Sequence, residues 1–139
     1  MKTLIWVPFI AFCELTFAQS VSPKVPSSLD TANIFALGPV GYAATTSQEE
    51  TQFKAILALD QGKAKQKLEQ LFESGNPQAM SYALAGMRKL DRKRFAELLL
   101  SARVSDLTVE TMSGCIGRKQ KLSTIASDLD SGKYDLWLF

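Results

Sequence analysis

Few side chains in this 139-residue sequence are of the types that perform catalysis. The sequence contains no histidine, which excludes Ser-His-Asp and Cys-His catalysis and any zinc site with a histidine ligand. Its cysteines form neither a metal-binding cluster nor a Cys-x-x-Cys pair, and it has no glycine-rich phosphate loop. An enzyme would have to use a carboxylate, a lysine or a lone thiolate, and we expect no cofactor and no bound metal.

Cys115 is the candidate thiolate. Arg118, Lys119 and Lys121 follow it, and positive neighbours favour the charged form of a thiol. The residues beside it include apolar ones such as Ile116, and no general base is close in sequence. We therefore expect Cys115 to be a small, buried and inert core residue.

The closest carboxylate pairs have simpler explanations than catalysis or metal binding. Glu49-Glu50 suits the start of a helix, where the helix dipole favours negative charge. Asp128-x-Asp130 lacks the glycine and the terminal glutamate of a calcium-binding loop. We assign neither pair to a site, and a cell-envelope enzyme that uses Cys115 or a carboxylate is the alternative to a non-catalytic protein.

A cluster of cations is the first candidate binding feature, and only Asp91 offsets it. Its members are Arg88, Lys89, Arg92, Lys93 and Arg94. Three of them fall in the first turn of a predicted helix, where the dipole disfavours positive charge by roughly 0.3 kcal/mol each. The cluster predicts a surface for an anionic partner such as an acidic protein, lipid headgroups or a polyanion. The alternative is a solvated helix corner.

The last four residues, Leu136-Trp137-Leu138-Phe139, are the second candidate binding feature. A chain end is normally polar and frayed, whereas this one carries two leucines and two large aromatic side chains. We expect the segment to pack back onto the domain. The functional alternative is that Trp137 and Phe139 insert into a partner groove or extend a partner sheet.

These side chains follow a segment typical of export. Met1-Lys2 supplies a positive start, Thr3 to Cys13 is largely apolar, and Thr16-Phe17-Ala18 offers a small-x-small cleavage site. The apolar stretch is shorter than the roughly 20 residues that a membrane-spanning helix needs. We predict a cleavable signal peptide over residues 1–18 and no transmembrane helix after cleavage.

Cleavage predicts a periplasmic or secreted protein with a flexible leader at 19–28 and a single domain at 29–139. Lipid anchoring at Cys13 is not expected, because Phe12 stands where lipobox sequences have a small residue. Cys115 would then be the sole remaining cysteine, so no intrachain disulfide forms. The net charge of +2 gives no nucleic-acid signature and indicates no oligomeric state.

Apolar residues at helical spacing predict that most of the domain is helical. Ser47 to Glu50 matches a capping box, in which Ser47 and Glu50 each bind the other's amide. Asn76-Pro77 and Asp91 are further start signals. The expected helices run from Ser47 towards Gly62, from Ala64 to Gly75, from Asn76 to Leu90, from Asp91 to Ala102 and from Ser123 to Gly132.

Two stretches are less regular. Leu29 to Thr46 is rich in apolar residues but is broken by Gly38-Pro39 and Gly41, which predicts an extended or turning segment packed on the domain. Leu107 to Leu122 predicts either a short β-hairpin that turns near Cys115 or a further helix.

The stretch from Ala64 to Arg103 resembles the helical pairs of HEAT and armadillo-like proteins. Small residues in its second helix (Ala83, Ala85, Gly86) and Asp106-x-x-Val109 after it carry the likeness, which implies stacked helical hairpins. The whole mature chain also resembles a group of small, uncharacterised exported bacterial proteins, a likeness that implies no activity. The residues that carry it are Gly41-Tyr42-Ala43, Tyr82-Ala83-Leu84, Gly114-Cys115 and Gly132-Lys133-Tyr134.

The sequence thus predicts a mainly α, HEAT-like domain of helical hairpins, with one short β-hairpin near Cys115. Helical-hairpin domains usually present binding surfaces, so we expect a non-catalytic interaction module, adaptor or inhibitor-like protein. Its expected partner is a protein, or another anionic surface, outside the cytoplasm.

Overall fold

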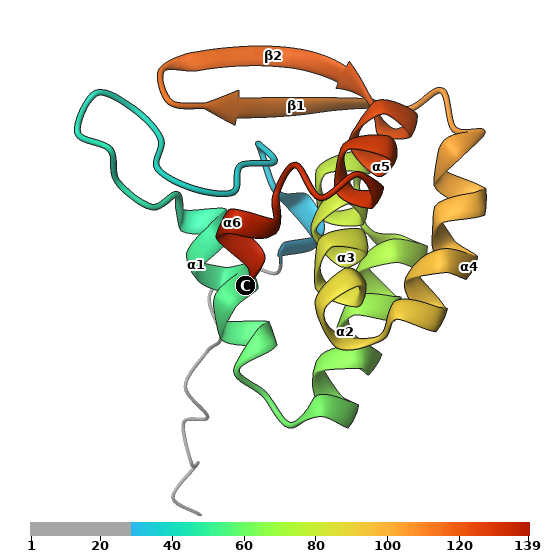
Figure 1. The fold of residues 1–139 in the computed structure, drawn as a ribbon. Coiled ribbons are helices and arrows are strands. Elements are labelled where there is room, and N and C mark those ends of the chain that lie inside the picture. Colours follow the sequence, from blue (N-terminus) through green and yellow to red (C-terminus); the bar gives the residue numbers. More distant parts are fainter. Residues whose placement is uncertain (1–28) are drawn as a thin grey trace, which may run out of the picture.

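A computed structural model of the chain describes residues 29–139 (Figure 1). The predicted signal peptide (1–18) and leader (19–28) lie outside the described residues. After a short 3₁₀ turn at Leu29–Thr31, the elements are α1 (Gln48–Leu57), α2 (Gln61–Ser74), α3 (Pro77–Leu90), α4 (Arg92–Arg103), β1 (Thr108–Ser113), β2 (Ile116–Lys121), α5 (Leu122–Asp130) and α6 (Asp135–Leu138). The prediction of a mainly helical fold with a β-hairpin near Cys115 is confirmed.

The predicted helix starts are real caps. The side-chain oxygens of Ser47, Asn76 and Asp91 accept from the amides of Glu50 (3.0 Å), Ala79 (2.9 Å) and Arg94 (3.0 Å). Each satisfies a backbone donor that has no partner within the helix. The prediction that the Glu50 side chain accepts from the Ser47 amide is wrong. The buried Glu50 carboxylate accepts instead from the Gly38 amide at 3.0 Å and pairs with Lys54 at 2.8 Å.

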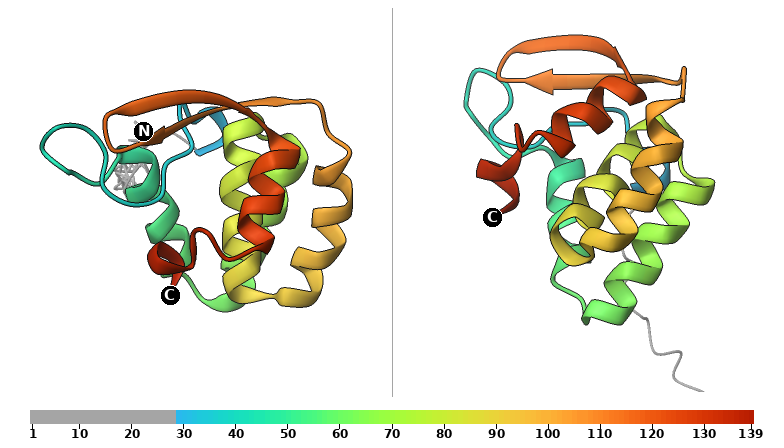
Figure 2. Two further views of the ribbon diagram at one scale, coloured as in Figure 1. Left: turned by 45° about the horizontal axis from the view of Figure 1, so that its top comes forward. Right: turned by 45° about the vertical axis from the view of Figure 1, so that its right-hand side comes forward.

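Helix α3 lies at the centre of the domain. It packs against α2, α4, α5 and β1, and its residues from Gln78 to Arg88 are almost all buried (Figure 2). A helix covered on all sides needs small residues where neighbours approach closely, and a Cβ added at Gly86 would lie 2.6 Å from Leu68 Cδ1 of α2. The small residues noted in the sequence therefore serve helix packing.

Strands β1 and β2 form an antiparallel hairpin, so the expectation of a helix at 107–122 is wrong. Gly114 takes φ +56° at the first turn position, where a type II′ turn places glycine. Phe35 adds a bridge to the other edge of β1: its amide donates to Glu110 O at 2.7 Å, and its carbonyl accepts from Met112 at 3.1 Å. Residues 32–40 of the segment predicted at 29–46 are thus extended and largely buried against the domain, as predicted, whereas 41–46 form an exposed turn.

The hairpin crosses one end of the helices (Figures 1 and 2). Its base is anchored by Val109 and Leu122, both fully buried, whereas its turn projects beyond α5 towards the loop at 40–45. The Gly41 amide donates to Gly114 O at 2.9 Å and ties that loop to the turn. Among residues 29–139, no helix has the length and apolar character needed to cross a membrane.

Candidate binding groove

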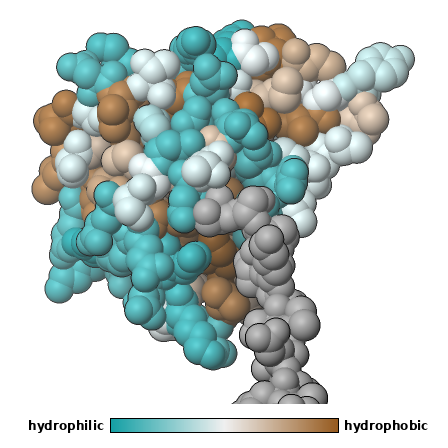
Figure 3. Space-filling model, turned by 180° about the vertical axis from the view of Figure 1, so that it is seen from behind, coloured by the Kyte–Doolittle hydropathy of each residue, from teal (hydrophilic) through white to brown (hydrophobic). Residues whose placement is uncertain are grey.

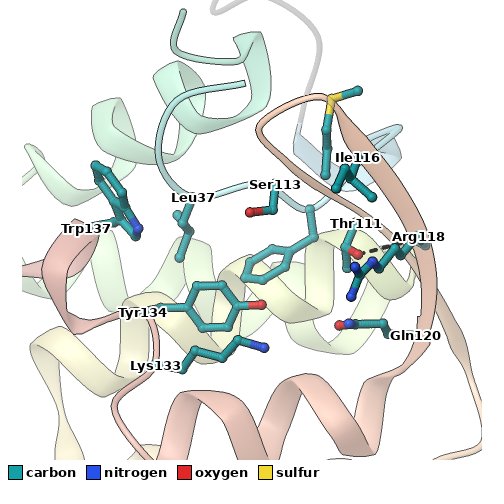
Figure 4. A pocket seen from close by; sticks show the side chains of 11 residues that line it. Leu37, Thr111, Ser113, Ile116, Arg118, Gln120, Lys133, Tyr134 and Trp137 are labelled. Carbon is teal, nitrogen blue, oxygen red and sulfur yellow. Dashed lines mark hydrogen bonds between the residues drawn. The ribbon is translucent and has the colours of Figure 1, made fainter. Parts of the chain in front are cut away.

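An open cavity of about 300 Å³ lies beneath the hairpin (Figure 4). The inner face of the hairpin forms its roof, and the chain between α5 and α6 forms its opposite wall. Phe35 and Leu37 of the extended segment complete it. We call this cavity the hairpin groove. The residues that line it are Phe35, Leu37, Thr111, Met112, Ser113, Ile116, Arg118, Gln120, Lys133, Tyr134 and Trp137.

The alternation of side chains along the strands explains the roof. In a strand successive side chains point to opposite faces, and the register pairs Thr111 with Arg118 and Ser113 with Ile116. Together with Gln120, these residues share the face that looks onto the groove. Because the turn of the hairpin projects past the helical core, this face is covered at its base and open towards its turn.

The wall of the groove is aromatic. Phe35 and Tyr134 meet edge to face, with ring centroids 5.5 Å apart and planes at 75°. Burial raises the pKa of Tyr134 to about 12, so its hydroxyl is a neutral donor at physiological pH. That hydroxyl has no hydrogen-bond partner within residues 29–139. Trp137 stands at one end of the groove with 43% of its surface exposed.

The charged groups that line the groove are both positive. Lys133 is partly neutralised by Asp128, which lies 2.6 Å from its ammonium group. Arg118 of β2 makes no ion pair in the described part of the chain, and its guanidinium points into the groove (Figure 4). Within the part of the chain that the structure describes, no carboxylate lines the groove, so the groove favours a negatively charged group.

Gln120 supplies an amide without a partner. Its Oε1 is buried, yet no residue of the described chain donates to it. A buried acceptor left without a donor costs about 1–3 kcal/mol, so its place on the groove wall suggests that a ligand or water supplies the donor. The groove therefore combines apolar walls, an uncompensated cation and unpartnered polar groups.

The structure disperses the predicted basic cluster. Arg88 is 6% exposed and pairs with Asp135 of α6, whereas Arg94 Nη2 lies 2.8 Å from Glu69 Oε2. Lys89 donates to Leu138 O at 2.6 Å. Three members are exposed and make no ion pair within 29–139, namely Lys89, Arg92 and Lys93. The anionic-partner hypothesis for this corner stays a prediction, but most of its cations serve the fold.

These ion pairs shift the pKa values of their members. The hydrogen bonds from Arg88 lower the pKa of Asp135, and Asp135 in turn raises the pKa of Arg88. Hydrogen bonding to Arg94 likewise lowers the pKa of Glu69. Both carboxylates are therefore ionised at neutral pH and are explained by structural pairing.

The C-terminal segment is divided between packing and exposure. Leu138 is 3% exposed, and the Trp137 ring covers Gly38, where an added Cβ would lie 2.6 Å from Trp137 Cε2. Leu136 and Phe139 remain 80% and 68% exposed, with Lys89 Nζ 5.9 Å from the Phe139 ring centroid. The expected packing onto the domain is confirmed for Trp137 and Leu138.

Cys115 is exposed, so the expectation of a buried cysteine is wrong. It occupies the second position of the hairpin turn, and the projection of that turn beyond the helices leaves its side chain in solvent. Cys115 makes no hydrogen bond within residues 29–139 and does not line the groove. In the same part of the chain, no group of three or more His, Cys, Asp or Glu side chains is placed to hold a metal ion.

Comparisons with protein-family models, with curated proteins and with solved structures found no match to this chain. The family resemblances noted in the sequence therefore stay expectations. Most of the groove was not predicted from the sequence. Neither Gln120 nor Phe35 was expected to belong to a site, and Lys133-Tyr134 was singled out only by a family resemblance. Alternation along 107–122 was the available signal, because it places Arg118 and Gln120 on one face once a hairpin is assumed.

Proposed function

We propose that this chain is an exported, non-catalytic interaction module whose partner is a protein held at the hairpin end of the domain. The hairpin groove carries the proposal, because it is an open recess with aromatic walls and polar groups that lack internal partners. Such recesses, apolar with a few polar groups that converge, are the usual form of binding sites. Export rests on the N-terminal sequence.

The rim of the groove supports a macromolecular partner. Tyr42, in the loop tied to the hairpin turn, is fully exposed, and Ile116 is 56% exposed. With Trp137 they supply large, exposed apolar side chains in or beside the groove, of the kind that interfaces bury. Seen from behind, hydrophilic residues cover much of the surface, and apolar patches lie near the hairpin and also along the side of the helical body (Figure 3).

The arrangement gives less support to an enzyme. An exposed thiol at a hairpin turn needs a neighbouring base to act as a nucleophile, and Cys115 hydrogen-bonds to no group in the described residues. The carboxylates of Asp128 and Asp130 pair with Lys133 and Arg103 on the surface. Both therefore have structural partners in place of a reacting group.

The test is affinity capture from envelope extract with matched surface variants. Ile116→Asp places a charge on the groove roof, and Leu100→Asp places the same charge on α4, where the wild-type leucine is 69% exposed. We expect a protein that is retained by the wild type and by Leu100→Asp and is lost with Ile116→Asp. Equal retention by all three forms would show that the groove end is not the binding surface.

A further inference from the structure

We propose that the hairpin groove binds the carboxyl terminus of a peptide chain whose last residue is apolar. The inference rests on the proposed function and specifies the partner chemistry at the same site. Its basis is that Arg118, Gln120 and the aromatic wall face one recess (Figure 4). These three elements match the three parts of a chain end, which are a carboxylate, a peptide group and a side chain.

Arg118 selects the carboxylate. Its guanidinium offers donors in a planar fork that matches both oxygens of a carboxylate, and it has no acidic partner among residues 29–139. Lys133 adds positive charge on the opposite wall, although its ion pair with Asp128 partly neutralises that charge. Among residues 29–139 no acidic side chain lines the recess, which leaves the charge of Arg118 available to an incoming anion.

Gln120 selects a peptide group. A primary amide carries a donor and an acceptor side by side, which is the complement of a peptide N–H and C=O. The buried Oε1 of Gln120 lacks a donor within the described chain, and a peptide N–H would supply it. A fully deprotonated inorganic anion such as sulfate has acceptors for Arg118 but has no donor for this oxygen. The amide therefore favours a peptide end over a simple anion.

The apolar walls select the last side chain, and the volume limits the ligand. Ile116 and Trp137 are partly exposed and line opposite ends of the recess, so an apolar side chain packed against either would cover surface that water now contacts (Figure 4). A volume of about 300 Å³ lies at the small end of ligand pockets. It suits one or two terminal residues, while the rest of the partner leaves through the open side.

The test uses labelled hexapeptides, Gly-Ser-Gly-Ser-Ala-X, with each of the twenty residues as X, prepared both as free acids and as C-terminal amides. Fluorescence anisotropy measures their binding to the full chain. We expect the free-acid peptides with apolar X to bind. Amidation should lower their affinity at least tenfold, roughly the effect of losing one charge-assisted contact. Equal binding of acids and amides would overturn the proposal.

Protein variants then locate the contact. Arg118→Gln and Gln120→Leu should each weaken the binding of the best acid at least tenfold. Lys63→Gln removes a charge from α2 that is 73% exposed and does not line the groove, so it should leave the affinity unchanged to within about twofold. Circular dichroism checks that each variant is folded. If Arg118→Gln is folded and binds as well as the wild type, the carboxylate assignment is wrong.

The outcome is separable from that of the proposed function. If no hexapeptide binds with a Kd below about 1 mM while Ile116→Asp still abolishes capture of a protein partner, the groove is an interaction surface but does not read chain ends. If peptides bind at Arg118 and capture does not depend on Ile116, the site is real and its role as the docking surface for the captured partner fails.

Discussion

The guanidinium of Arg88 is held by both oxygens of the Asp135 carboxylate, with Nε 2.8 Å from Oδ1 and Nη2 2.9 Å from Oδ2. The Arg88 side chain is 7% exposed and that of Asp135 is 41% exposed, so one partner comes from the core and the other from the surface. The pair joins the central helix α3 to α6. It thereby fixes the chain segment that forms one wall of the hairpin groove.

Removing this pair should destabilise the fold more than removing a surface pair. Arg88→Gln loses hydrogen bonds to a charged partner and a contact 5.8 Å from the Phe95 ring centroid. We expect a loss of about 2 kcal/mol in the free energy of unfolding, measured by urea titration. The control is Arg103→Gln, whose pair with Asp130 is 46% exposed on both sides and should contribute about 0–1 kcal/mol. Equal effects of the two variants would refute the anchoring role.

The ion pairs of Asp135 with Arg88 and of Glu69 with Arg94 should make the free energy of unfolding fall in acid. Hydrogen bonds from arginine lower the pKa values of Asp135 and Glu69 in the folded protein. In the unfolded chain the pKa values of these carboxyl groups are about 3.9–4.3. Their contribution is fully present above those unfolded values and is lost as pH falls through the lower folded values. Urea midpoints measured from pH 7 to pH 2 should therefore decline below about pH 4. Asp135→Asn should show a shallower decline, and an unchanged slope in that variant would contradict this assignment.

The helical part of the fold was predictable because its signals are local. Asn76-Pro77 and Asp91 mark helix starts by chemistry that acts within one turn, and the structure contains both caps. The basic cluster was less informative, since the sequence does not reveal that Arg88 faces Asp135, 47 positions away. Charges that are close in sequence became parts of separate long-range pairs.

The groove was less predictable for the same reason. Its lining comes from the extended segment, both strands and the chain before α6, and its shape depends on how far the hairpin projects from the helices. The prediction that Cys115 is buried is wrong for the same reason. Its apolar sequence neighbours would indicate burial only if the helical core extended as far as the hairpin turn. Alternation along the strand places Gln120 on the same face as Arg118, but it does not reveal that the side-chain oxygen of Gln120 lacks a donor within residues 29–139.

The C-terminal segment should divide sharply between stabilising and dispensable residues. Leu138 is 3% exposed and Leu136 is 80% exposed, although they are identical in chemistry and lie in the same turn. Leu138→Ala should lower the free energy of unfolding by about 2 kcal/mol, near the small end for a buried leucine because a chain end can relax. Leu136→Ala should change it by less than about 0.5 kcal/mol. Similar effects of the two variants in a thermal or urea titration would show that the segment does not pack as described.

The contact between Gly38 and Trp137 should be required for the shape of the groove. Gly38 has φ +96°, its amide donates to Glu50, and an added Cβ would lie 2.6 Å from Trp137 Cε2. Gly41 also has positive φ (+72°) but has no atom within 4 Å of such a Cβ, so Gly41→Ala reproduces the backbone strain without the clash.

Gly38→Ala should therefore destabilise the fold by about 1–3 kcal/mol more than Gly41→Ala does, the usual cost of overpacking. It should also shift the fluorescence emission of Trp137, which is the remaining tryptophan once residues 1–18 are removed. Because Trp137 stands at one end of the groove, displacing its ring should lower the affinity of any ligand that contacts the ring. Two alanine variants with the same stability and the same emission would show that Trp137 does not rest on Gly38.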